Sequence, residues 1–270
     1  MTKKKSALSG SSAPKPGNHL VISFPDVHFP HQDDAAIGVL LHTIELLRPD
    51  VVVGLGDLLD AGKFASHPKK QLQEVAASSF YKDEIKPANL FLDKIQKYSN
   101  ELVLISGNHE ARVEAVAAQL GGPMSAVYDL ISPETLLTGN RSNCKWIPYH
   151  DELSHYSIAK NLWAIHGTYF GTHAAYSHLQ AYKPTSIIFG HVHRAQSHVT
   201  RDPATRKIVK AWSPGCLSKL QPLYQQGTPT NWVHGFSLIY VKDDLSEFTE
   251  YTLIIEDGQT VLPGGKTVKA

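Results

Sequence analysis

Residues 186–193 have the sequence SIIFGHVH, an apolar run that ends in a glycine and two histidines one residue apart. A run of four residues rich in β-branched and aromatic side chains is too short for a helix and is typical of a strand buried on both faces. Four other runs share this composition, and each is closed by Gly, Asp or Pro: HLVISF, DVVVGLG, ELVLISG and NLWAIHG. The sequence therefore predicts a set of short buried strands.

Helical patterns separate the first of these runs. Residues 33–50 open with two aspartates and stop near Pro49, and residues 71–98 are amphipathic with Pro87 as a kink or a break. Strands that alternate with helices predict a largely parallel sheet covered on both faces. Three later apolar runs between residues 206 and 257 are separated only by turn residues, which favours antiparallel hairpins that close a second sheet. We expect an α/β protein, a two-sheet β-sandwich flanked by helices.

The length and composition are those of one globular unit with polar ends. With 270 residues and 42% hydrophobic content, the chain can bury one large core, and we expect a single domain over residues 19–257. Residues 1–18 are rich in Ser, Lys, Pro and Gly, which bury too little apolar surface to offset the entropy of ordering. We therefore expect a flexible N-terminal tail over residues 1–18 and, by the same reasoning, a C-terminal tail over residues 258–270.

Charge and cysteine content narrow the classes of function. The 26 Lys and Arg residues nearly balance 25 Asp and Glu residues, so a net charge of +1 gives no general reason to expect a nucleic-acid or membrane surface. Cys144 and Cys216 lie far apart in the sequence and suggest neither a disulfide framework nor a thiolate metal cage. No apolar stretch has a length close to the roughly 20 residues of a membrane-spanning helix. These features favour a cytoplasmic protein without a membrane partner and leave its oligomeric state open.

Polar side chains gather where the predicted strands end. In open α/β sheets, ligands bind outside the carboxyl ends of the strands. Carboxylate, amide oxygen and imidazole without thiolate suit divalent Mn, Fe, Zn, Ni or Co better than calcium or a structural zinc. Seven candidate ligands are too many for one tetrahedral ion and suit two ions that share a carboxylate. They are Asp26, His28, Asp57, Asn108, His166, His191 and His193.

These residues form an ordered series of motifs: D-x-H at 26–28, G-D-x-x-D at 56–60, G-N-H-E at 107–110, a lone His166 and G-H-x-H at 190–193. In this order the chain resembles the calcineurin-like metallophosphoesterases. The resemblance implies their αββα fold and a hydrolase that cleaves phosphoester bonds with a hydroxide bridging two divalent ions. Mn is the first choice of metal, and Fe, Zn, Ni and Co are alternatives. Any single motif would be weak evidence, because short motifs recur by chance.

The resemblance also implies a role for each site residue. Asp57 would bridge the two ions, and His109 would stabilise the phosphoryl group or protonate the departing oxygen. Asp60 would orient the His109 ring through its other nitrogen. One ion would be held by Asp26, His28, Asp57 and His193, and the other by Asp57, Asn108, His166 and His191.

Two arginines and one long segment are open to more than one interpretation. Arg112 and Arg194 closely follow two of the motifs, so each either meets a phosphate oxygen of the substrate or serves in helix capping or a salt bridge. Residues 217–236 lack regular periodicity and contain Tyr224 and Trp232. These aromatic side chains either stack on a nucleobase or pack the segment onto the core or another subunit.

One departure from the family pattern bears on the substrate. Protein Ser/Thr phosphatases of this superfamily continue the second motif with Arg and Gly, whereas here Ala61 and Gly62 follow Asp60. The arginine that would grip a phosphomonoester is missing from that place, which favours phosphodiesters such as nucleotides or a nucleic-acid backbone. The alternatives are a phosphomonoesterase or protein phosphatase and, more remotely, a non-catalytic scaffold that binds protein partners. A DNA-processing nuclease is one version of the favoured hypothesis.

Overall fold

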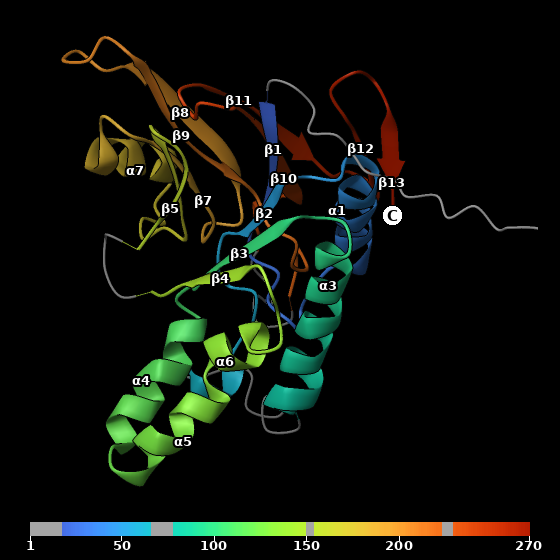
Figure 1. Cartoon of the computed structure of the whole chain (residues 1–270), viewed down its shortest axis with the longest axis vertical. Coiled ribbons are helices and arrows are strands. Elements are labelled where there is room, and N and C mark those ends of the chain that lie inside the picture. Colours follow the sequence, from blue (N-terminus) through green and yellow to red (C-terminus); the bar gives the residue numbers. More distant parts are fainter. Residues whose placement is uncertain (1–17, 66–77, 150–153, 223–228) are drawn as a thin grey trace, which may run out of the picture.

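The computed structural model describes residues 18–65, 78–149, 154–222 and 229–270, which form two main β-sheets and the helices around them (Figure 1). The five predicted buried runs are all strands of these sheets. The expectation of an α/β two-sheet sandwich flanked by helices is therefore confirmed.

The first sheet has six strands in the order β11-β10-β1-β2-β3-β4. Strands β1 to β4 are parallel, and β10 and β11 continue the sheet in antiparallel order. The parallel order places the carboxyl ends of β1, β2 and β3 at one edge. The bounds are β1 (Asn18–Phe24), β2 (Val51–Gly54), β3 (Glu101–Ile105), β4 (Cys144–Ile147), β10 (Gly235–Lys242) and β11 (Phe248–Ile254).

The second sheet has five strands in the order β5-β6-β7-β9-β8. Strands β6, β7 and β9 are parallel, and β5 and β8 are antiparallel to their neighbours. The sequence predicts that all three later runs close this sheet, and that is wrong in part, because β10 and β11 extend the first sheet instead. The bounds are β5 (Tyr156–Ala159), β6 (Leu162–Ile165), β7 (Ser186–Phe189), β8 (Ala195–Arg201) and β9 (Ile208–Pro214).

An apolar core joins the two sheets face to face. Val53 of the first sheet lies in one buried cluster with Ile188 and Trp212 of the second. Trp212 Nε1 also donates a hydrogen bond of 3.2 Å to Ser237 Oγ on β10. Because interiors are packed as densely as organic crystals, this shared core fixes the ends of one sheet relative to the ends of the other.

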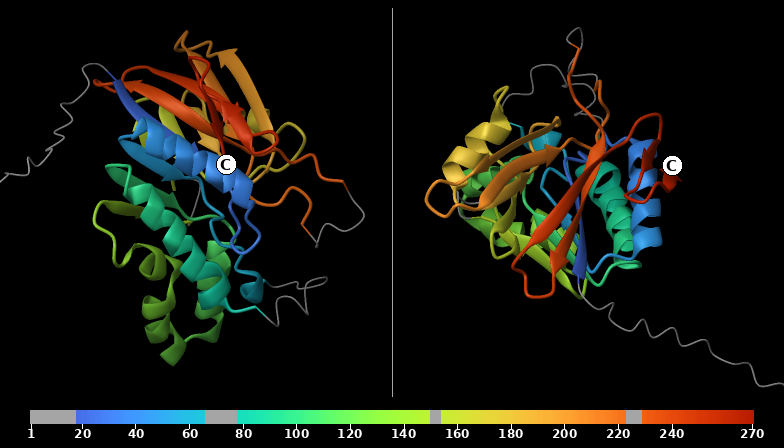
Figure 2. Two further views of the ribbon diagram at one scale, coloured as in Figure 1. Left: turned by 90° about the vertical axis from the view of Figure 1, so that its right-hand side faces the viewer. Right: turned by 90° about the horizontal axis from the view of Figure 1, so that it is seen from above.

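Helices cover the outer face of each sheet. Figure 2 shows α1 (Asp34–Leu47) and α3 (Lys86–Gln96) side by side on the first sheet, where their apolar side chains join its outer core. Pro87 is the second residue of α3 and lies just after an irregular, π-helical turn. The 3₁₀ turn η1 (Gly62–Phe64) follows β2, and one π-helical turn, η2 (Phe80–Ile85), leads directly into α3. The other helices are α4 (Glu110–Leu120), α5 (Pro123–Ile131), α6 (Pro133–Thr138) and, on the second sheet, α7 (Ala174–Tyr182).

The C-terminal segment is a hairpin, so the expectation of a tail over residues 258–270 is wrong. Strands β12 (Gln259–Val261) and β13 (Thr267–Lys269) pair beside α1 (Figure 1). Leu262 and Val268 are buried and belong to the outer core of the first sheet. The segment has few apolar residues, but the hairpin places these two on the core side, which the composition does not reveal.

The expected N-terminal tail lies outside the described residues except for Asn18, which already begins β1. Among the helices in the described ranges, none has both the length and the apolar composition needed to cross a membrane.

We predict that Leu262→Ala lowers the free energy of unfolding by about 2–5 kcal/mol, because it removes a buried side chain that joins the hairpin to the core. Urea denaturation of the full chain measures this change. The neighbouring Val261 is 56% exposed, so Val261→Ala is the matched control and should stay within about 0.5 kcal/mol of the original chain. Equal effects of the two substitutions would contradict the packing role of the hairpin.

Candidate metal centre

The seven expected metal ligands converge from both sheets. Asp26 and His28 follow β1, Asp57 follows β2, and Asn108 follows β3, so the first sheet supplies four of them from adjacent parallel strands. The second sheet supplies His166 after β6 and both His191 and His193 after the neighbouring β7. The site therefore lies where the carboxyl ends of the two facing sheets meet.

One group of ligand atoms lies around His28. Asp26, His28 and His193 each place one ligand atom within 4.8 Å of the others. The Nε2 atoms of His28 and His193 are 3.0 Å apart, and Asp26 Oδ1 is 3.5 Å from His193 Nε2. Asp57 Oδ2 lies 3.7 Å from His28 Nε2 at the edge of this group.

A second group lies around His166. Asp57, His166 and His191 also place one ligand atom each within 4.8 Å of the others. Asp57 Oδ2 is 3.4 Å from His166 Nε2. The amide oxygen of Asn108 lies 2.9 Å from His166 Nε2 and 2.8 Å from His191 Nδ1. Asp57 Oδ2 is thus the atom that neighbours both groups.

These donors fit divalent cations. Asp26, His28, Asp57 and His166 are each at most 2% exposed, and a buried charged group is costly unless it is paired or coordinates a metal. Burial would raise the pKa of Asp57, but the charges of His166 and His109 hold it well below its usual value. Burial lowers the pKa of His28 to about 4, which keeps this imidazole neutral, the form that binds metals. Burial would lower the pKa of His166 and His193, but Asp57 raises that of His166 to about 9 and Asp26 raises that of His193 to about 10, so a cation would take the place of these protons. Carboxylate and imidazole together form a nitrogen and oxygen donor set for a divalent transition metal.

The backbone at the ligands is strained. Five of the seven ligand residues have left-handed φ angles, which non-glycine residues rarely adopt: Asp26 37°, His28 53°, Asp57 51°, His191 69° and His193 56°. Such conformations cost on the order of 1–3 kcal/mol each and persist only where the surroundings hold them. In the short turn after β7, these left-handed conformations direct the side chains of His191 and His193 toward different groups of ligand atoms.

Glu110 is a buried support of the site that the sequence analysis leaves without a role. Its side chain is 1% exposed and accepts three hydrogen bonds from main-chain N–H groups. The donors are Asp57 at 3.1 Å, Leu59 at 2.8 Å and Gly107 at 2.8 Å, which ties the loops after β2 and β3 together. The signal was in the sequence, because Glu110 is the last residue of the GNHE motif.

His109 and Arg112 lie together beside the ligands. The His109 Nδ1–H donates to the main-chain oxygen of Asp60 at 2.7 Å, and Arg112 Nη2 donates to His109 Nε2 at 2.9 Å. The Asp60 carboxylate, expected to orient the ring, lies farther away, with Oδ1 3.5 Å from His109 Nδ1. Arg112 Nη1 donates to the same Asp60 main-chain oxygen at 3.1 Å. The structure thus brings His109, Asp60 and Arg112 together, with the main chain of Asp60 at the centre.

Arg194 and Trp232 support the loops of the site. Arg194 Nη2 donates to the main-chain oxygens of Phe170 and Gly171 at 2.8 Å each, which anchors the loop that follows His166. The Trp232 ring packs on the His193 ring with their centroids 4.1 Å apart. For Trp232, this contact agrees with the interpretation that aromatic side chains of residues 217–236 pack against the protein. Tyr224 lies outside the described residues.

His178 is a further buried support. It is fully buried on α7, its Nδ1–H donates to Ala174 O at 2.9 Å, and its Nε2 accepts from Thr168 N at 3.1 Å. This bond holds the loop directly after His166. No motif or periodicity distinguishes His178 from the other histidines, so sequence reasoning had no means of finding it.

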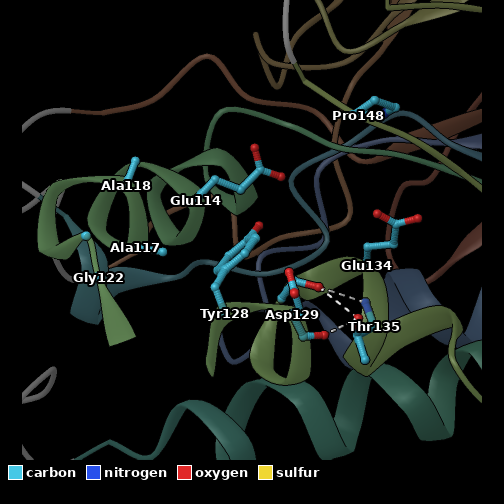
Figure 3. Close-up of a pocket in the computed structure, with 11 residues that line it drawn as sticks. Glu114, Ala117, Ala118, Gly122, Tyr128, Asp129, Glu134, Thr135 and Pro148 are labelled. Carbon is cyan, nitrogen blue, oxygen red and sulfur yellow. Dashed lines mark hydrogen bonds between the residues drawn. The ribbon is translucent and has the colours of Figure 1, made fainter. Parts of the chain in front are cut away.

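A separate hollow of about 620 Å³ lies among α4, α5 and α6 (Figure 3). The carboxylates of Glu114, Asp129 and Glu134 line it together with Tyr128. Burial raises the pKa of Tyr128, and the Glu114 charge raises it further. This acidic lining is unsuited to a phosphate group.

A sandwich of two sheets with buried histidines and aspartates at their meeting ends defines a metal-binding phosphoesterase architecture. The family model described as calcineurin-like phosphoesterase matches residues 20–195, and the chain belongs to this family. All the expected metal ligands lie within that range.

Sequence relatives include two phage proteins. The Gene 54 protein of Mycobacterium phage L5 is 24% identical over 232 residues, which cover 82% of this chain and 88% of that protein. The Gene 54 protein of Mycobacterium phage D29 is 24% identical over 237 residues, with the same coverage.

Similar solved structures include Vps29 from Entamoeba histolytica in complex with Zn²⁺, with 15% identity, a TM-score of 0.47, and coverage of 93% of this chain and 98% of that one. Another is the phosphoesterase Yfce from E. coli, with 13% identity, a TM-score of 0.39, and coverage of 86% of this chain and 98% of that one.

We predict that Gly107→Ala abolishes metal binding, because the added Cβ would overlap Asp57 Oδ1 and the Asp57 main-chain nitrogen. Elemental analysis of the purified full chain, after incubation with Mn²⁺ and desalting, measures the metal content. A Cβ at Gly171 meets nothing within 4 Å, so Gly171→Ala is the matched control and should keep the original metal content. Full metal content in Gly107→Ala would contradict the placement of Asp57 in the site.

Proposed function

We propose that this protein is a metal-dependent phosphoesterase that uses two divalent ions, Mn²⁺ by first choice, and acts on phosphodiesters of the nucleotide or nucleic-acid class. The observation that carries the proposal is the position of Asp57 Oδ2, 3.4 Å from His166 Nε2 and 3.7 Å from His28 Nε2, between two groups of candidate ligands. A carboxylate in this position can be shared by two metal ions.

Each group of ligands would hold one ion. Asp26, His28 and His193 would bind the first, and Asn108, His166 and His191 the second, with Asp57 shared. When bound, the two ions would activate a water molecule as the nucleophile and neutralise charge on the phosphoryl oxygens. The protein's own contribution is to hold these side chains in place before substrate arrives, which is supported by their burial and their strained turns.

His109 and Arg112 would act on the substrate itself. The His109 ring is fixed by its bond to the Asp60 main-chain oxygen, and its Nε2 lies 3.9 Å from Asp57 Oδ2. If Arg112 turned to the substrate and Nε2 took up a proton, the ring would stabilise the phosphoryl group or give that proton to the departing oxygen. Arg112 donates to the same nitrogen, so its guanidinium is placed to meet a phosphoryl oxygen by a charge-assisted hydrogen bond.

The preference for diesters rests on the residue directly after the second motif. Ala61 stands where an arginine would grip a phosphomonoester, and its side chain is fully buried. A monoester carries one more negative charge than a diester, so the loss of that cation weakens monoester binding more. The alternative function remains a phosphomonoesterase or protein phosphatase.

A non-catalytic scaffold is the alternative from another class. Such a protein has no need of seven converging metal ligands or of an ordered histidine beside them. The retention of both supports catalysis, and metal analysis together with a hydrolysis assay separates the two functions.

We predict that the Mn²⁺-loaded chain hydrolyses bis-p-nitrophenyl phosphate with a higher kcat/KM than p-nitrophenyl phosphate. Release of p-nitrophenol measures both rates, and a chelator should abolish them. Asp57→Asn, which weakens the shared ligand, should lose both metal and turnover. A clear preference for the monoester would reverse the choice of substrate class, and undiminished hydrolysis by Asp57→Asn would contradict the proposed site.

We predict that His109→Ala retains both metals and the fold but lowers kcat by about 10²–10⁴-fold, the usual contribution of a general acid or base. Metal content and thermal unfolding of the variant should match those of the original chain, because His109 contributes no metal-ligand atom in this proposal. An unchanged rate on both model substrates would remove His109 from catalysis.

A further inference from the structure

Glu84 is a buried carboxyl group that belongs to none of the motifs. It lies in η2, just before α3, and is 2% exposed. Its Oε2 accepts a hydrogen bond of 2.7 Å from the main-chain N–H of Ala61. Burial, together with the nearby Asp60 and Glu110, raises the pKa of Glu84 to about 8. Burying a carboxyl group is costly. The burial of Glu84 against the loop that carries Asp60 and Ala61 therefore implies a structural or functional role.

The Ala61 N–H that donates to Glu84 belongs to the Asp60–Ala61 peptide unit, and the oxygen of this same unit accepts a hydrogen bond from His109. The Asp60 oxygen of that unit accepts from His109 Nδ1 at 2.7 Å and from Arg112 Nη1 at 3.1 Å. A peptide unit is planar, so its N–H and C=O cannot turn independently. Whatever fixes the N–H of Ala61 therefore fixes the direction of the oxygen that His109 and Arg112 contact.

The backbone beside this peptide also needs support. Ala61 has φ 47° and ψ 35°, a left-handed conformation that is unfavourable for a residue with a Cβ. The bond from Glu84 is made to the nitrogen of this same residue. A bond at that nitrogen stabilises the left-handed turn against relaxation to the usual backbone conformation.

We propose that Glu84 is a positioning residue: it fixes the Asp60–Ala61 peptide and, through it, the orientation and tautomer of the His109 ring and the place of Arg112. Its effect on turnover rests on the proposed function, but its effect on the ring does not. Hydrogen bonds in a chain strengthen one another. The carboxyl group at the N–H end of the peptide therefore makes the Asp60 oxygen a stronger acceptor for His109 Nδ1–H.

Two substitutions test the hydrogen bond from Ala61 N to Glu84. Glu84→Leu removes the acceptor, whereas Glu84→Gln keeps an acceptor oxygen of the same reach. We expect Glu84→Leu to lower kcat on the diester about 10- to 100-fold with unchanged KM and metal content, the usual effect of losing a residue that orients a site. Glu84→Gln should restore most of the activity.

A double variant tests whether the effect passes through His109. In the His109→Ala background, Glu84→Leu should lower kcat by a smaller factor than in the original chain, because the part of its effect that passes through His109 is already lost and only the part through Arg112 remains. Leu92→Ala is the control for lost stability, since Leu92 is fully buried on α3 and lies in the outer core of the first sheet. It should lower the unfolding temperature but keep kcat, so a loss confined to Glu84→Leu cannot come from stability alone.

The ring itself provides a readout that needs no activity. Nitrogen-15 correlation spectra of the full chain should show His109 with a slowly exchanging Nδ1–H, and His109→Ala identifies the signal. In Glu84→Leu this signal should shift and lose its protection, and in Glu84→Gln it should remain. Should Glu84→Leu fail to fold, Glu84→Asp takes its place, because a side chain shorter by one methylene cannot reach Ala61 N.

The activity and His109 signal together distinguish the positioning role of Glu84 from the proposed function. An inactive original chain whose His109 signal depends on Glu84 overturns the proposed function and keeps the positioning role. An active original chain with the same kcat and the same His109 signal in Glu84→Leu, or in Glu84→Asp, overturns the positioning role and keeps the proposed function.

Discussion

Asp57 Oδ2 lies 3.4 Å from His166 Nε2 and 3.7 Å from His28 Nε2, and the surrounding structure holds this carboxylate between two sets of imidazoles. An ionised carboxylate with 2% exposure is stable only if cationic partners or hydrogen bonds replace its water. Part of that replacement is a bond of 3.0 Å from His109 N to Asp57 Oδ1. The family and the donor set support binding of a divalent cation, which would replace the protons of the neighbouring imidazoles as the source of positive charge.

The strain at the ligands is balanced by buried acceptors. Glu110 receives the N–H of Asp57 itself, and Asp26 receives the N–H of His191 through both of its oxygens at 2.9 Å. These bonds are made to the residues whose backbones are left-handed. Asp26, a candidate ligand, and Glu110, which is not one, therefore both hold unfavourable turns of the site, and this gives the buried Glu110 a structural role.

The sequence predicted the strands correctly, and it predicted which candidate ligands lie together, because both depend on local chemistry. A run such as SIIF is stable mainly as a buried strand, and the candidate ligand His191 directly follows the end of that strand. It did not predict the C-terminal hairpin, where Leu262 and Val268 are isolated apolar residues in a polar segment. Nor did it predict Glu84, because an acid in an amphipathic helical stretch is ordinarily solvent-exposed, and only the tertiary fold turns it toward Ala61.

The division of the ligands between two sheets links the site to the stability of the whole fold. Each group of ligands contains residues of both sheets, as Asp26 of the first group follows β1 and His193 follows β7. A cation bound by either group therefore joins the sheets at their ends, while the core around Trp212 joins them along their length. Because a ligand that binds only the folded state stabilises it, metal binding and the packing of the sandwich reinforce each other. Conversely, we expect a substitution that loosens the core between the sheets to separate the two halves of each ligand group, so that its effect on metal affinity exceeds that of an equally destabilising change in the outer helices.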